Sequence, residues 1–135
     1  MSIKEQTTTK TKYYSEALRY MNNAKENLHK AGKEYNYYID DKYVRTACGV
    51  AYNAVLKALD CYFILKEIPT LKKGKRKSKE YYEMHLTTLD KKMLSSFVAT
   101  YEVLHLCGYY DGLTHIKTIN GGFDAAYEII ERIKP

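Results

Sequence analysis

The chain has 135 residues, 45% of them hydrophobic, with 22 basic and 16 acidic side chains and a formal net charge of +6. This length and this mixture predict one folded domain over residues 1–135 and exclude a disordered chain. Residues 1–12 hold no apolar leader segment, and no stretch approaches the roughly 18 apolar residues that cross a bilayer. We therefore expect a cytoplasmic protein without membrane contact, whose three cysteines are reduced core thiols.

The first helix is predicted over residues 14–31, where apolar side chains recur at alternating spacings of three and four positions and so form one stripe. Gly32 is a natural stop for this helix. Residues 1–11 are polar and are expected to form a flexible N-terminal tail, and residues 32–39 a polar, tyrosine-rich connection.

A long central helix is predicted to start at Asp40 or Asp41, either of which can cap it, and to end at Ile68 or earlier because Pro69 follows. Small residues recur along it and let a neighbouring helix approach closely. Asn53 and Asp60 lie near its apolar stripe, where buried polar groups usually fix packing and only occasionally line a site.

Residues 69–78 form a predicted basic hinge, and the eight positions 72–79, which we call the basic segment, account for the entire formal net charge of +6. Its six cations are Lys72, Lys73, Lys75, Arg76, Lys77 and Lys79. The rest of the chain is neutral, with 16 basic and 16 acidic residues. Clustered cations beside a helix start attract phosphates in a salt-dependent manner, so this is the candidate nucleic-acid or phosphate site. The alternatives are a solvated hinge and contact with an acidic protein or lipid surface.

A third helix is predicted from an N-cap at Ser78 to a stop at Gly108, with an unusually broad apolar face. Glycines then punctuate residues 109–122, leaving room for a short extra helical turn at residues 113–116, and the last helix is expected over residues 123–133. Together these segments predict an all-α fold, an antiparallel up-and-down bundle of four main helices with no convincing strand.

Two E-x-x-H sequences, ending at His29 and His105, have the spacing that di-metal bundles use. At about 100° per residue, however, both glutamates point away from the apolar stripes, so no metal site is expected, and His105 is interpreted as a core or margin residue. No catalytic triad and no phosphate-binding loop is recognisable, and no cofactor is predicted.

Tyrosine is unusually frequent, with 15 residues that include four adjacent pairs, and tryptophan is absent. The favoured interpretation is structural, because a tyrosine ring widens an apolar face while its hydroxyl stays in water. The alternative is a platform of exposed rings that stacks with bases or binds a partner.

The runs RTACGVAYNAVLKALD at residues 45–60 and FDAAYEIIERI at residues 123–133 carry a pattern of small and apolar helical positions. With this pattern, over roughly residues 12–134, the chain resembles HEPN domains, which are small all-α bundles. The resemblance implies a homodimer with a cleft that binds RNA or nucleotide. In active members it also implies a ribonuclease with an Arg-x4-6-His motif before the last helix.

His115 stands at the place of the motif histidine, but Tyr109 and Tyr110 stand where the arginine is needed, and no arginine lies between residues 76 and 132. A neutral phenol cannot supply the cation that stabilises charge on a phosphate, so a degenerate member without ribonuclease activity is expected. The resemblance carries over one candidate cleft, made of Tyr109, Tyr110, Asp111 and His115.

Three functions follow from these observations. The first is a non-enzymatic bundle that binds nucleic acid or a protein partner through the basic segment and residues 109–115. The second is a phosphate-directed hydrolase or ribonuclease with His115 as acid or base and lysines of the basic segment in place of the arginine. The third is a structural or accessory protein, such as half of a toxin–antitoxin pair, with a nucleotidyltransferase-type protein as candidate partner.

Overall fold

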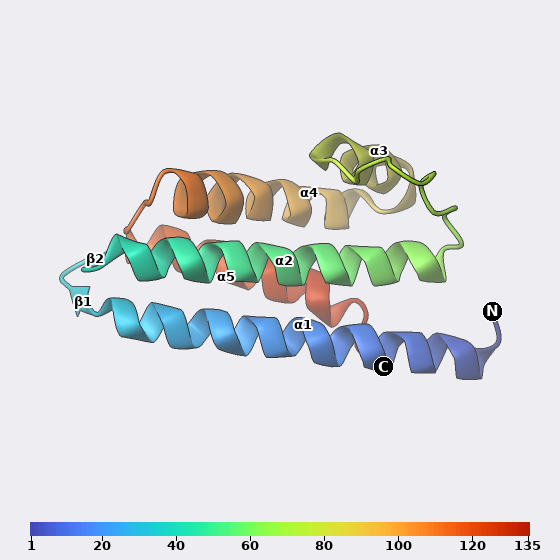
Figure 1. Ribbon diagram of the computed structural model, residues 1–135, viewed down its shortest axis with the longest axis horizontal. Helices are drawn as coiled ribbons and strands as arrows, with labels where there is room; N and C mark the ends of the chain where they lie inside the picture. The colour runs from blue at the N-terminus through green and yellow to red at the C-terminus, as the bar shows by residue number, and fades with distance from the viewer.

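The computed structural model describes residues 1–135 and is built almost wholly of helices (Figure 1). In chain order the elements are helix α1 (Ile3–Ala31), strands β1 (Lys33–Glu34) and β2 (Tyr37–Tyr38), and helices α2 (Asp41–Leu65), α3 (Lys79–Leu89), α4 (Lys91–Thr100), η1 (Tyr101–Tyr110) and α5 (Ile116–Glu131). Helices α1 and α2 lie side by side in opposite directions, α4 and η1 return along α2, and α3 lies across one end. The predicted all-α class is confirmed.

Helix α1 begins earlier than predicted, because residues 3–11 are helical and not a flexible tail. The Ser2 hydroxyl accepts a hydrogen bond from the backbone N–H of Glu5 and so caps the first turn. The polar sequence that suggested a tail forms an exposed extension of a helix whose apolar stripe starts later. Gly32 ends α1 as expected, with φ of 69°.

The connection between α1 and α2 contains two strands that the sequence analysis did not predict. Strands β1 and β2 pair antiparallel, with Lys33 opposite Tyr38. The N–H of Tyr38 also donates to the carbonyl of Thr114, and the N–H of Ile116 donates to the carbonyl of Asn36. The hairpin is therefore anchored to the start of α5, which explains why such short strands persist.

Helix α2 is the central helix, as predicted, and the Asp40 carboxylate caps it by accepting from the N–H of Lys42. By length and composition this helix could cross a membrane, since an 18-residue window has a mean hydropathy of 1.3, which the sequence analysis did not expect. Within the fold, 56% of that window is buried, as in the core helix of a bundle.

The segment predicted as a single third helix forms three elements in the structure, α3, α4 and η1. Asp90 adopts an extended conformation, ends α3 and caps α4 by accepting from the N–H of Met93. Its carboxylate also pairs with Arg132 beyond α5, and these donors lower its pKa. The chain then runs without a break into η1, a π-helix, and passes the predicted stop at Gly108. Gly108 is buried where η1 packs on α2, so this glycine serves a close contact and not a terminus.

The last helix, α5, starts at Ile116, seven positions before the predicted start at Phe123. No separate helical turn precedes it, and the glycine pair at residues 121–122 lies inside the helix and not at its entry. The hairpin contacts hold residues 114–116 in place and set the start of the helix. Gly122 is buried against η1, so packing offsets the cost of about 1 kcal/mol for glycine in a helix.

Candidate functional site: an aromatic cleft beside the basic segment

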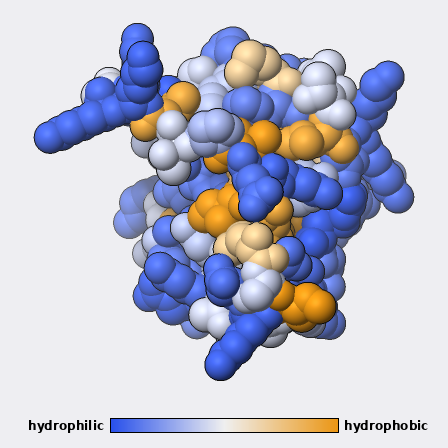
Figure 2. Space-filling view, turned by 90° about the vertical axis from the view of Figure 1, so that its right-hand side faces the viewer, coloured by the Kyte–Doolittle hydropathy of each residue, from blue (hydrophilic) through white to orange (hydrophobic).

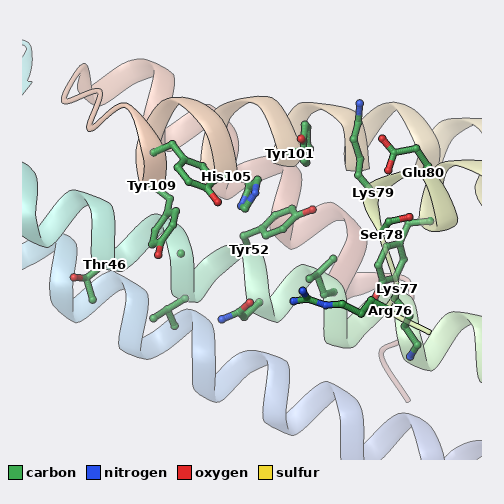
Figure 3. Close-up of a pocket in the computed structure, with 16 residues that line it drawn as sticks. Thr46, Tyr52, Arg76, Lys77, Ser78, Lys79, Glu80, Tyr101, His105 and Tyr109 are labelled. Atoms are coloured by element: carbon green, nitrogen blue, oxygen red, sulfur yellow. The ribbon is translucent and has the colours of Figure 1, made fainter. Parts of the chain in front are cut away.

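A cleft with a volume of about 920 Å³ lies between α2, η1 and the start of α3 (Figure 3). We call it the aromatic cleft. Its walls come from α2 (mainly Thr46, Gly49, Tyr52 and Asn53), from η1 (Tyr101, His105, Tyr109 and Tyr110) and from the basic segment (Arg76, Lys77, Ser78 and Lys79). The cleft therefore brings together the two regions that the sequence analysis singled out, the basic segment and the tyrosine pair at residues 109–110.

Tyr52 forms the floor of the aromatic cleft. Its side chain is only 8% exposed and packs against core residue Phe97, with 6.4 Å between ring centroids. On the cleft side it stacks with His105 at 4.7 Å and meets Tyr101 edge-on at 6.2 Å. Burial raises the pKa of Tyr52, and the nearby Tyr101 and Glu83 add to the effect, so its hydroxyl keeps its proton at neutral pH.

The π-helical geometry of η1 aligns a column of three rings along the cleft. Tyr101, His105 and Tyr109 are four residues apart, and successive centroids lie 5.2 and 6.2 Å from one another. In an α-helix, four residues overshoot a turn of about 3.6 residues, so the column would wind away from α2. Hydrogen bonds from i to i+5 widen the turn, which places residues four apart almost above one another.

The outer end of this column is open to solvent. Tyr109 is 45% and Tyr110 is 59% exposed, and their rings meet edge-on at 5.1 Å. Tyr110 also meets His105 edge-on at 4.9 Å. Burial lowers the pKa of His105, so the imidazole in the middle of the column is a neutral ring at pH 7. The wall thus offers exposed aromatic faces beside a neutral imidazole at this end.

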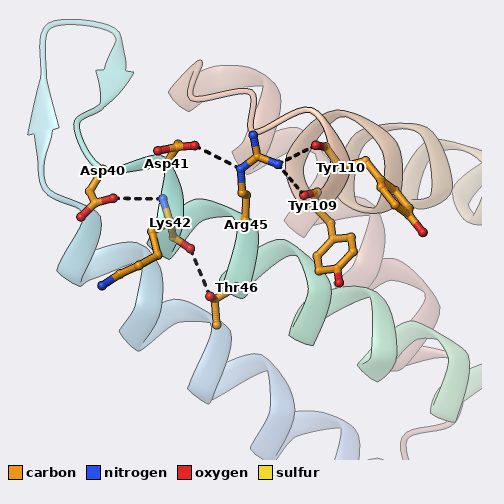
Figure 4. Close-up of polar contacts among 7 residues, drawn as sticks. All are labelled: Asp40, Asp41, Lys42, Arg45, Thr46, Tyr109 and Tyr110. Atoms are coloured by element: carbon orange, nitrogen blue, oxygen red, sulfur yellow. Dashed lines mark hydrogen bonds and ion pairs between the residues drawn. The ribbon is translucent and has the colours of Figure 1, made fainter.

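Arg45 of α2 holds the end of η1 in place (Figure 4). Its guanidinium donates to the backbone carbonyls of Tyr109, at 3.2 Å, and Tyr110, at 2.5 Å, and pairs with Asp41 at 3.1 Å. The last carbonyls of a helix have no partner within it, so Arg45 supplies the missing donors. A contact to the backbone positions both tyrosines and leaves their rings free.

Close helix contact also sets the position of the Tyr109 ring. Gly49 of α2 lies under this ring, and a Cβ atom at residue 49 would be 2.9 Å from it. Deeper in the same interface, a Cβ atom at Gly108 would be 2.3 Å from the Cys48 sulfur. The absence of side chains at these two positions lets η1 approach α2 and bring its rings to the floor of the cleft.

The basic segment enters the cleft with only part of its charge. Arg76 makes no ion pair and extends into the cleft, whereas Lys77 pairs with Asp60 at 3.1 Å and Lys79 with Glu83 at 3.2 Å. The other three cations of the predicted site, Lys72, Lys73 and Lys75, are exposed outside the cleft. Figure 2 looks onto this end of the molecule, where hydrophilic side chains project around exposed apolar atoms.

Asp60 and Asn53, the two polar residues predicted near the stripe of α2, have different surroundings. Asp60 is half-buried and accepts a hydrogen bond from the Tyr82 hydroxyl at 2.9 Å, in addition to its pair with Lys77. Asp60 therefore ties the basic segment to the core. Asn53 is exposed in the wall of the aromatic cleft and is free to bind a ligand.

His115 lies apart from the aromatic cleft. It precedes α5, where its Nδ1 is 2.8 Å from the Thr118 hydroxyl and its ring meets Tyr37 edge-on at 5.6 Å. The basic segment follows the opposite end of α2 (Figure 1). The predicted grouping of residues 109–111 with His115 is therefore divided: Tyr109 and Tyr110 line the cleft, while Asp111 and His115 do not. The hydrolase hypothesis needs His115 and the lysines in one site, and the fold separates them.

Comparison with known proteins places the chain in a family. The family described as "Domain of unknown function (DUF5618)" matches residues 12–135. The chain belongs to the DUF5618 family. A solved structure, a protein of unknown function from Dyadobacter fermentans, is 40% identical, with a TM-score of 0.79, and the match covers 98% of this chain and 97% of that chain. No curated protein matches.

Sequence reasoning missed the deeper half of the DUF5618 cleft. The sequence analysis singled out neither Tyr52 nor Tyr101 and interpreted His105 as a core or margin residue, so the meeting of these three rings was not predicted. The only signal was the recurrence of rings at residues 101, 105 and 109. That spacing indicates a ring column only if the helix is wider than an α-helix, and the sequence has no marker of a π-helix.

Proposed function

We propose that this DUF5618 protein is a non-catalytic binding protein that takes single-stranded RNA or nucleotide in the aromatic cleft. The observation that carries the proposal is that the exposed rings of Tyr109 and Tyr110 share one cleft with Arg76, which has no ion-pair partner. Aromatic faces beside cations are the combination with which proteins bind single strands, because every base has a π-face and every linkage a phosphate.

The two ends of the cleft suit the two parts of a nucleotide. The tyrosine end is aromatic, with a neutral His105 behind it, and suits a base. The end beside α3 has Arg76 and Lys79 and suits a phosphate. A volume of about 920 Å³ is within the range of small-molecule sites, so one or two nucleotides fit and the rest of a strand would follow the exposed lysines.

The proposal includes two features implied by the HEPN resemblance. We propose an antiparallel bundle of four main helices, α1, α2, the α4–η1 pair and α5, with α3 as an added element. We also propose that the protein is a homodimer, so that the exposed lysines of two copies can contact one strand. Sedimentation of the purified protein tests the dimer separately from binding.

The proposal is tested by titrating a labelled mixed-sequence single-stranded RNA into the wild type and two cleft variants at several salt concentrations. Tyr110→Ala removes one exposed ring and is expected to weaken binding by roughly 5- to 150-fold. Arg76→Gln is expected to weaken binding and to lower the slope of log affinity against log salt by about 0.7 for the lost contact. The RNA is expected to stay intact on a gel.

Matched controls come from surfaces outside the cleft. Tyr35→Ala removes a tyrosine that is 93% exposed in the hairpin, and Arg19→Gln removes an exposed arginine of α1. Both are expected to bind RNA as the wild type does. Equal loss in cleft and control variants would show non-specific binding. Absence of wild-type binding would refute the proposal and favour a protein partner, and cleavage lost in His115→Ala would favour the hydrolase hypothesis.

A further inference from the structure

We infer that the α3 end of the aromatic cleft is a phosphate subsite, in which the Tyr52 hydroxyl donates a hydrogen bond to the anion. The inference rests on the proposed function for the base at the other end of the cleft. Three neighbouring features favour the anion: an unpartnered hydroxyl at the end of a buried side chain, the free amides at the start of α3, and two cations beside them.

The Tyr52 hydroxyl is the first feature. The residue as a whole is more than nine-tenths buried, but its hydroxyl oxygen is open to the cleft and makes no hydrogen bond within the protein. Among the other buried tyrosines, Tyr38 donates to Asn120 at 3.1 Å and Tyr82 donates to Asp60 at 2.9 Å, whereas the Tyr62 hydroxyl, outside the cleft, makes no hydrogen bond within the protein. In Figure 3 the Tyr52 hydroxyl points along the cleft toward Ser78 and Lys79. Because no protein group uses this hydroxyl, it is available as a donor to a ligand in the cleft.

The start of α3 is the second feature. The Ser78 hydroxyl accepts from the N–H of Tyr81 and so caps one of the first amides of this 11-residue helix. The N–H groups of Lys79 and Glu80 make no hydrogen bond within the protein. The free amides and the positive end of the helix dipole both favour an anion at this point, and Ser78, Lys79 and Glu80 all line the cleft.

The third feature is the set of charged groups at this end. The Lys79 ammonium lies 4.7 Å from the Tyr101 ring centroid and 3.2 Å from Glu83, and Arg76 reaches in from the other side without an ion pair. Glu80 at the rim and Glu83 oppose an anion. A bound phosphate would therefore compete with Glu83 for the Lys79 ammonium. Arg76 would supply a positive charge that no carboxylate of the protein neutralises. Because Tyr52 stays protonated, its hydroxyl is a donor and adds no repulsion.

This arrangement predicts a ligand in which a phosphate and a base are joined through one sugar. A phosphate at Tyr52 and a base on the rings of Tyr109 and Tyr110 would lie at the two ends of one column. The chemistry is shared by a mononucleotide, the 5′ end of a strand and an internal linkage. The affinities of a tetranucleotide with and without a 5′-phosphate distinguish these ligands. A tenfold higher affinity for the phosphorylated form would show that the subsite binds a terminal phosphate, and equal affinities would show that it binds an internal one.

The test compares wild type with Tyr52→Phe, using adenosine, adenosine monophosphate and inorganic pyrophosphate as calorimetric ligands. A hydrogen bond to a charged group is worth about 1.5–3 kcal/mol, so Tyr52→Phe is expected to lose roughly 10- to 150-fold in affinity for the monophosphate. Its affinity for adenosine is expected to stay as in the wild type. The matched control is Tyr38→Phe, which removes a buried hydroxyl outside the cleft.

Each outcome decides one of the two claims. If Tyr52→Phe binds both the monophosphate and pyrophosphate as tightly as the wild type does, the subsite is overturned and the proposed function stands. Pyrophosphate binding that is lost in Tyr52→Phe, without binding of adenosine or RNA, supports the subsite and refutes the proposed function. A wild type that gains nothing from the phosphate and ignores pyrophosphate refutes the subsite. Thermal melting checks folding, and Tyr52→Phe is expected to be at least as stable as wild type because no intramolecular hydrogen bond is lost.

Discussion

Replacing Gly108 by alanine tests the contact that holds η1 against α2. The new methyl group would lie 2.3 Å from the Cys48 sulfur and 2.7 Å from its Cβ, whereas carbon atoms pack at about 3.5–4.0 Å. Overpacking of a buried contact costs about 1–3 kcal/mol, and two clashing atoms suggest the upper end. Alanine recovers about 1 kcal/mol of helix propensity, which leaves a net loss of about 2 kcal/mol.

Urea denaturation and thermal melting measure this loss. For a chain of this length, about 2 kcal/mol lowers the midpoint by about 7 °C. Gly121→Ala is the matched control: nothing lies within 4 Å of a Cβ atom there, so this variant is expected to be as stable as wild type or more so. Adding Cys48→Ala to Gly108→Ala removes the sulfur from the clash and should recover about 1 kcal/mol of coupling energy.

The reasoning is refuted if Gly108→Ala is as stable as the wild type, or if the loss is the same with and without Cys48→Ala. The first result would mean that η1 and α2 separate without cost. The second would mean that the loss comes from the backbone of η1 and not from the contact with α2.

Two further predictions concern the cleft walls. Arg45→Gln removes the donors to the last carbonyls of η1, so it is expected to lower the free energy of unfolding in urea by about 1–2 kcal/mol and to weaken RNA binding. The control, Lys42→Gln at an exposed neighbouring position, should change neither quantity. An Arg45→Gln variant as stable as the wild type would refute the role of Arg45. The pKa values of Tyr52 and Tyr82 are raised in the fold by burial, so the unfolded chain loses these protons first. The contribution of these two tyrosines to stability is therefore expected to be constant up to about pH 10 and to fall above it. Above that pH, the stability of a Tyr52→Phe variant should fall less steeply than that of the wild type; an unchanged slope would contradict the burial argument.

The sequence predicted the parts of this fold that depend on local chemistry. The caps at Asp40 and Ser78 and the stop at Gly32 were located correctly, because each rests on a side-chain oxygen or on a positive φ that only a few residue types supply. The core stripe of α2 was also located correctly, because periodicity alone fixes the buried face of a long helix.

The errors have a common physical cause, since contacts between distant segments outweighed local preference. Asp90 was overlooked because its role as a cap depends on the turn between α3 and α4. Gly108 and Gly122 were taken as termini, whereas both allow close packing of helices far apart in the sequence. The basic segment and Tyr110 were identified separately, but their meeting in one cleft depends on where α3 crosses the bundle.

The π-helix also has a consequence for how chain length relates to function in this family. A turn closed from i to i+5 contains one more residue than a turn closed from i to i+4. A member shorter by one residue between positions 101 and 110 could continue α4 as a regular helix with the same core and the same end points. The rings of such a member would no longer line up with Tyr52. The number of residues in this stretch would therefore distinguish family members that have the aromatic wall from members that share only the fold.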